Sequence, residues 1–128
     1  IRFDPAQSLE TWHVAVNPMP EIAGLRFLLP RLLALPKTLT TESQRSRWAR
    51  MLQELPPVPV GEVDGVKLLR PADSFSACAN SENPELYAVF PYRMYGVGRP
   101  DLDMARATYE KRMNRHNRGC YERFCNLL

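Results

Sequence analysis

Prolines occur throughout this chain and limit the length of every regular element that it can form. The 128 residues include 12 prolines and only 6 glycines, and no proline-rich tract collects them. Because proline lacks a backbone N–H and fixes its own φ angle, it is excluded from most helix interiors and from central strands. The sequence therefore predicts short elements whose ends fall at prolines.

The size and composition are those of one globular folding unit. Hydrophobic residues make up 45% of the chain and charged residues 24%, which differs from the composition of a disordered protein. No apolar run approaches the roughly 18 residues of a transmembrane helix, so we expect no membrane partner. The three cysteines lack CxxC spacing and the two histidines lie far apart. Neither a disulfide scaffold nor a metal site is indicated, and we expect no cofactor.

Positive charge gathers in the last part of the chain. The formal net charge is +3, and residues 93–128 hold eight arginines and lysines against four acids. A nucleic-acid surface usually combines a denser basic face with aromatic platforms. We therefore interpret this charge as a solvated helix end and do not expect a nucleic-acid partner.

Three segments have the apolar periodicity of helices. Apolar residues recur at helical spacing over residues 20–35, where a proline occupies the first turn. Thr41 and Gln44 have the form of a capping box, which predicts a second helix that a double proline ends at position 56. A third helix is expected from about residue 100 to residue 119, with acids at its start and cations near its end.

Two further segments predict a strand pair and a short helix. Residues 58–69 carry branched apolar side chains on both sides of a glycine-bounded centre, which is typical of a short β-hairpin. Asn83 and Pro84 are suited to the start of a short apolar helix that ends at Pro91. Helices of this length with long connections are not typical of a compact four-helix bundle. We expect a mainly α fold of helical hairpins from a larger α/α assembly, with one short β-hairpin.

Carboxylates in polar loops are the candidate catalytic groups. The chain has no GxGxxG, P-loop, HExxH or Gly-x-Ser-x-Gly motif, so phosphate-cradling loops, zinc hydrolases and serine esterases have no signature here. A carboxyl group against a tryptophan can act as a general acid, and Glu10 lies close to Trp12. A glycosidase needs at least two carboxyl groups, one on each side of the sugar. Glu82 and Glu85, in a second polar loop, are therefore further candidates. Taken alone, Glu10 fits an exposed loop acid or a helix cap better than a catalytic acid, and Glu85 fits better an acid that complements a helix dipole.

Several short motifs occur in the order found in six-hairpin (α/α) barrel glycosidases. They are QSLETW at residues 7–12, LPPVPVG at 55–61, DGVKL at 64–68 and LYAVFP at 86–91. In this order they resemble the inverting α-L-fucosidases of glycoside hydrolase family 95, over most of residues 7–119. The resemblance implies that residues 1–128 form a partial (α/α) barrel catalytic domain. It also suggests a secreted or periplasmic protein whose substrate is an oligosaccharide or another glycoside.

The resemblance further implies roles for individual residues. Glu10 matches the general acid of the family, and Trp12 would form a wall of the sugar pocket. Asn80, Glu82 and Glu85 would face the mouth of the active site. The histidines and the arginine of the family's motif near residues 80–86 are replaced here, so the sugar is left open. The base would come from segments outside this chain, so we expect the remainder of the barrel as a partner and no activity from the isolated chain.

A second class of function stays open beside the glycosidase. The chain could be a non-catalytic helical interaction module, in which residues 86–91 and the basic helix from Pro100 form a protein-binding or anion-binding face. An inactive fragment of a glycosidase is a further interpretation. Independent cooperative unfolding would favour the module, because a barrel fragment would expose apolar surface and self-associate.

Overall fold

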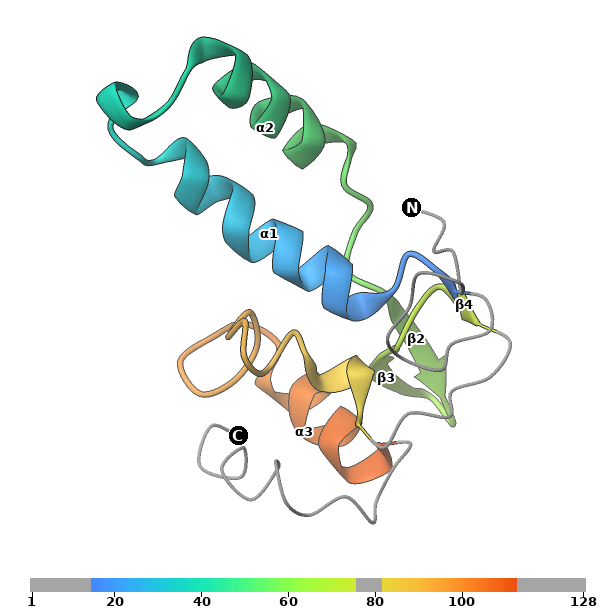
Figure 1. Ribbon diagram of the computed structural model, residues 1–128. Coiled ribbons are helices and arrows are strands. Elements are labelled where there is room, and N and C mark those ends of the chain that lie inside the picture. Colours follow the sequence, from blue (N-terminus) through green and yellow to red (C-terminus); the bar gives the residue numbers. More distant parts are fainter. Residues whose placement is uncertain (1–14, 76–81, 113–128) are drawn as a thin grey trace.

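The computed structural model describes residues 15–75 and 82–112. In chain order the elements are β1 (Ala15–Val16), α1 (Met19–Leu33), a 3₁₀ turn (Lys37–Leu39), α2 (Glu42–Glu54), β2 (Val60–Val63), β3 (Val66–Leu69), β4 (Ser74–Phe75), a second 3₁₀ turn (Pro84–Leu86) and α3 (Leu102–Lys111). The α1–α2 hairpin lies at one end of the molecule, and β2, β3 and α3 lie together at the other (Figure 1).

The α1–α2 hairpin confirms the first two predicted helices. Thr41 and Gln44 form the capping box at the start of α2. At the connecting end, the guanidinium of Arg45 donates hydrogen bonds to the carbonyl oxygens of Leu33 (2.9 Å) and Leu35 (3.2 Å). The last carbonyls of a helix have no intrahelical partner, so a cation at this place stabilises the end of α1.

A second arginine joins the open end of the same hairpin. The guanidinium of Arg26, in the middle of α1, donates to the carbonyl oxygens of Leu55 (3.0 Å) and Pro56 (2.8 and 3.1 Å) just after α2. These bonds fix the chain where it leaves α2. α2 itself has no buried residue, so its position depends on half-buried side chains and on the two arginines.

β2 and β3 form the predicted β-hairpin. They are antiparallel, with Val60 opposite Leu69. Asp64 and Gly65 make the turn, with φ angles of 54° and 75°. Two positive φ angles are the signature of a type I′ turn, whose twist matches that of the strands. No pattern in the sequence predicts the second sheet, in which β1 pairs with β4 in antiparallel register.

The predicted apolar helix after Asn83 is wrong. Only Pro84–Leu86 form a 3₁₀ turn, and Asn83 makes no side-chain cap to it. Pro91 supplies no backbone donor and restricts the residue before it, so the stretch between the two prolines is too short to establish an α-helix. We refer to residues 82–92, which continue as turns, as the turn segment.

The core lies where the turn segment meets α1, β3 and α3. Its buried residues are Met19, Ala23, Leu69, Leu86, Ala88, Val89 and Ala105. α3 also binds the outer edge of β3, because the backbone N–H of Leu69 donates to Oγ1 of Thr108 (2.9 Å) and that hydroxyl donates to the carbonyl oxygen of Met104 (2.7 Å). The helix therefore covers a strand edge that would otherwise be open.

These contacts contradict the expected mainly α fold of barrel hairpins. Within residues 15–75 and 82–112, α1 and α2 are the one helical hairpin, and α3 packs on β3 and the turn segment (Figure 1). The fold is mixed α/β, with helices beside two short two-stranded sheets. The expectation failed because it required the apolar run at residues 86–90 to be a helix that could pair with its neighbour.

Replacing Thr108 with Val should destabilise the fold by about 1–3 kcal/mol, because the buried N–H of Leu69 loses its acceptor while the side-chain volume is kept. Urea unfolding followed by circular dichroism measures the change. Thr38→Val, at an exposed position of the first 3₁₀ turn, is the control and should change the stability by less than about 0.5 kcal/mol. Equal effects of the two substitutions would contradict the assigned role of Thr108.

Candidate functional site

The structure places two of the five residues that the sequence singled out. Glu10, Trp12 and Asn80 lie outside the described residues. Glu82 and Glu85 both lie on the turn segment. They are close in sequence, but their surroundings differ. Glu82 is half-buried and accepts a hydrogen bond from the hydroxyl of Tyr87, whereas Glu85 is only 2% exposed and lines a pocket.

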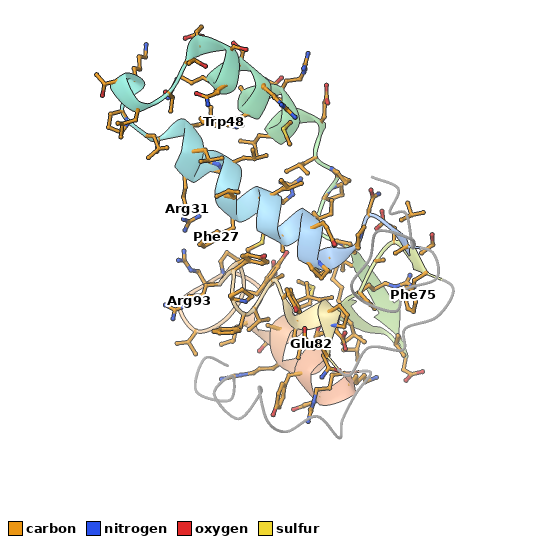
Figure 2. The ribbon with its side chains drawn as sticks, in the orientation of Figure 1. Phe27, Arg31, Trp48, Phe75, Glu82 and Arg93 are labelled. Carbon is orange, nitrogen blue, oxygen red and sulfur yellow. The ribbon has the colours of Figure 1, made fainter. Side chains whose placement is uncertain are left out.

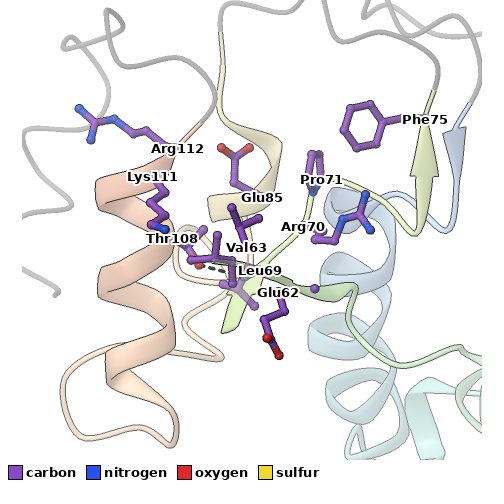
Figure 3. A pocket seen from close by; sticks show the side chains of 12 residues that line it. Glu62, Val63, Leu69, Arg70, Pro71, Phe75, Glu85, Thr108, Lys111 and Arg112 are labelled. Carbon is purple, nitrogen blue, oxygen red and sulfur yellow. Dashed lines mark hydrogen bonds between the residues drawn. The ribbon is translucent and has the colours of Figure 1, made fainter. Parts of the chain in front are cut away.

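This Glu85 pocket lies between the β2–β3 hairpin, α3 and the turn segment, and its volume is about 400 Å³ (Figure 3). Its position follows from the packing of α3 on β3, because both elements contribute walls to it. Its lining consists of Gly61, Glu62, Val63, Leu68, Leu69, Arg70, Pro71, Phe75, Glu85, Thr108, Lys111 and Arg112.

Cations from two elements surround the Glu85 pocket. Arg70 follows β3, whereas Lys111 and Arg112 lie at the end of α3 (Figure 3). Nζ of Lys111 lies 3.3 Å from Oδ2 of Asp64 in the hairpin turn. The guanidinium of Arg112 lies 4.3 Å from the centre of the Tyr109 ring, in the geometry of a cation–π contact. A buried carboxylate is thus combined with three cations in the same lining, of which Lys111 is paired with Asp64.

The described residues of the pocket do not include the two facing carboxylates of an inverting glycosidase. Such enzymes hold an acid and a base about 6.5–9.5 Å apart across the sugar. Glu62 is the second acid of the lining, but it is exposed and its carboxylate points away from that of Glu85 (Figure 3). The arrangement suits the binding of a ligand better than a complete hydrolytic step.

Several lining residues were missed by the sequence reasoning. Phe75 and Arg70 follow the predicted hairpin, and no motif marks them as site residues. Lys111 and Arg112 were interpreted as cations that complement the dipole of the last helix. The long-range packing of α3 on β3 brings these residues to one place, and a single sequence does not show that packing.

The described residues offer no site for a metal and no membrane span. No group of three or more His, Cys, Asp or Glu side chains among them is placed to hold a metal ion. In the same part of the chain, each helix is too short or too polar to cross a bilayer.

A second pocket, of about 410 Å³, contains a tyrosine with a shifted pKa. Tyr95 lines this pocket together with Asp101 and Arg26. Burial raises the pKa of the Tyr95 hydroxyl above its ordinary value of 10.0, and the negative charge of Asp101 raises it further, while the Arg26 guanidinium opposes the shift. Tyr95 therefore keeps its proton in the folded protein at pH values where an unfolded chain begins to lose it.

Replacing Tyr95 with Phe should reduce the loss of stability at alkaline pH. Because the folded state holds the proton more tightly, the contribution of Tyr95 is fully present below pH 10 and is lost as the pH rises through the higher pKa of the folded state. The free energy of unfolding of Tyr95→Phe should therefore rise relative to that of the wild type from about pH 9 to pH 11. Urea titrations across this range measure the difference, and parallel pH curves for the two proteins would contradict it.

No protein-family model matches this chain, and no curated protein or solved structure is significantly similar to it. A functional assignment therefore depends on the residues themselves and on their geometry.

Proposed function

We propose that this chain is part of a glycoside hydrolase and that the Glu85 pocket binds a saccharide unit of the substrate. The observation that carries the proposal is a buried carboxylate in a pocket of ligand size, beside an aromatic ring and cationic donors. The volume of about 400 Å³ lies within the range of about 300–1,000 Å³ that is usual for small-molecule sites. The motif order described above supports the choice of a saccharide.

The chemistry of the lining matches that of a sugar. A saccharide presents hydroxyl groups around a ring whose faces are apolar. In this proposal the carboxylate of Glu85 accepts hydrogen bonds from hydroxyls, and the side chains of Lys111 and Arg112 donate them. Phe75 and Val63 cover the apolar face of the sugar and exclude water from the polar contacts.

The proposed reaction is hydrolysis with inversion. Glu10 donates its proton to the glycosidic oxygen as the bond to the leaving group breaks. A carboxylate or another base from a different segment removes a proton from water, which attacks the anomeric carbon from the opposite face of the sugar. The reaction requires no cofactor, and Trp12 would raise the pKa of Glu10 by placing it in apolar surroundings.

Saccharide binding should depend on Glu85 and Phe75. We expect Glu85→Gln and Phe75→Ala each to weaken binding of a methyl glycoside about tenfold, since each removes a contact of roughly 1–2 kcal/mol. Saturation-transfer NMR and calorimetry with methyl α-L-fucoside and other methyl glycosides measure the affinity. Glu54→Gln, at an exposed position at the end of α2, is the matched control and should bind normally.

Two results would overturn the assignment of the pocket. One is that no methyl glycoside binds to the wild-type chain. The other is that folded Glu85→Gln and Phe75→Ala variants, checked by circular dichroism, bind as well as the Glu54→Gln control. Phe75→Ala keeps the test valid if the Gln substitution at the buried position 85 prevents folding.

The role of Glu10 calls for a turnover assay with the full-length protein. Glu10→Gln should lower kcat by about 10²-fold or more on an aryl glycoside with a poor leaving group, because that reaction depends on protonation of the leaving oxygen. The loss should be much smaller on a dinitrophenyl glycoside, whose leaving group needs little assistance. Equal losses on both substrates would show that Glu10 is not the general acid.

A further inference from the structure

A groove beside α1 is lined by arginines. It has a volume of about 640 Å³ and lies between α1, which contributes Arg26, Phe27 and Arg31, and the chain after the turn segment, which contributes Arg93 and Arg99. Figure 2 shows Phe27 and Arg31 projecting from α1 toward the loop that carries Arg93. None of its lining residues is shared with the Glu85 pocket.

Among the described residues, the lining of this arginine groove contains four arginines and no acid. Within the described part of the chain, none of these four arginines forms an ion pair. Like charges repel one another, and packing several guanidinium groups around one cavity has an electrostatic cost. An anionic ligand would remove that cost and would be attracted before contact.

Arg26 has a structural role in the groove. Its guanidinium is bonded to the carbonyl oxygens of Leu55 and Pro56, so it contributes mainly a fixed positive charge. Arg31 is held in place differently, because it lies 3.5 Å from the centre of the Phe27 ring and donates to the Phe27 carbonyl oxygen (2.6 Å). Stacking on one face leaves its remaining N–H groups available at the edge of the guanidinium.

Arg93 and Arg99 are exposed, and the backbone of their loop positions them. Arg93 has a φ angle of 49° and Gly98 one of 73°, while the backbone N–H of Arg99 donates to the carbonyl oxygen of Gly96 (2.9 Å). A non-glycine residue with positive φ is uncommon, and such strained positions gather at functional sites. Neither guanidinium has a hydrogen-bond partner in the described part of the chain.

Close packing fixes the groove between its two walls. The ring centres of Phe27 and Tyr92 lie 5.5 Å apart. Gly24 permits this approach, because a Cβ atom there would lie 2.9 Å from the hydroxyl oxygen of Tyr92. The two walls of the groove are therefore held in fixed positions, which lowers the conformational entropy that the protein loses when a ligand binds.

From this geometry we propose that the arginine groove binds a small ligand that carries a phosphate or sulfate ester. A guanidinium donates two parallel hydrogen bonds to tetrahedral oxyanions, which makes arginine the preferred residue for this chemistry. The limited volume of about 640 Å³ and the net charge of only +3 favour a small ligand over a nucleic acid, which is usually bound along an extended basic face. The site is separate from the Glu85 pocket and does not depend on the proposed glycosidase activity.

Titration with glucose 6-phosphate, glucose 6-sulfate and uncharged glucose tests this proposal. Calorimetry and backbone NMR should detect binding of at least one ester at low salt, with shifts at α1 and at residues 90–100, and no binding of glucose at the groove. Affinity should fall as the salt concentration rises. The phosphate group of glucose 6-phosphate gains its second charge near pH 6. If the groove prefers phosphate, the affinity for glucose 6-phosphate increases as the pH rises through this value and exceeds that for glucose 6-sulfate. If it prefers sulfate, glucose 6-sulfate binds more tightly, with an affinity that does not change with pH.

Charge-matched double variants locate the binding. Arg93→Gln combined with Arg99→Gln should weaken ester binding about tenfold or more, whereas Arg47→Gln combined with Arg50→Gln, on the exposed face of α2, should change it less than twofold. Equal losses in the two double variants would show that net charge and not the groove causes the binding. Failure of both esters to bind the wild type, or binding of glucose at the groove as tight as that of the esters, would also overturn the proposal.

Discussion

Apolar packing of the turn segment is the interaction on which the rest of the fold depends. Leu86 and Val89 are each 1% exposed, and they meet side chains from α1, β3 and α3 in one cluster. Burial of each such side chain contributes about 1.5–3 kcal/mol. The same segment carries Glu85 on one side and continues into the arginine groove on the other, so both proposed sites are positioned by one short stretch of irregular chain.

Local signals in the sequence predicted those elements whose ends are set by nearby residues. The capping box at Thr41, the apolar spacing of α1 and the glycine-bounded centre of residues 58–69 all act within a few positions. The structure confirms the two helices and the β-hairpin that they predict. The helix expected after Asn83 was wrong because Pro91 outweighs the apolar composition of the residues before it. The pairing of β1 with β4 joins strands of two residues each, which is too short for any periodicity.

The residues of the two candidate sites differ in the same way: local patterns mark some of them, and contacts between distant parts of the chain bring the others into place. The sequence singled out Glu82 and Glu85 as candidates because they lie in a polar loop, and Glu85 lines a pocket. Phe75 and Lys111 reach that pocket only because α3 packs against β3, which is a contact between distant parts of the chain. The arginine groove combines α1 with a loop more than 60 positions later. The sequence left open an anion-binding face formed by residues 86–91 and the basic helix from Pro100, but it did not indicate that α1 contributes arginines to the same groove.

The absence of buried residues in α2 has a consequence for the dynamics of the molecule. Stability is distributed unevenly in proteins, and units with few buried contacts open at lower free energy than the core. α2 is attached through a half-buried stripe and through Arg26 and Arg45, so we expect it to open as a separate cooperative unit. Its amide protons would exchange with solvent by a partial opening, in which α1, β3 and α3 keep their mutual packing and the Glu85 pocket stays intact.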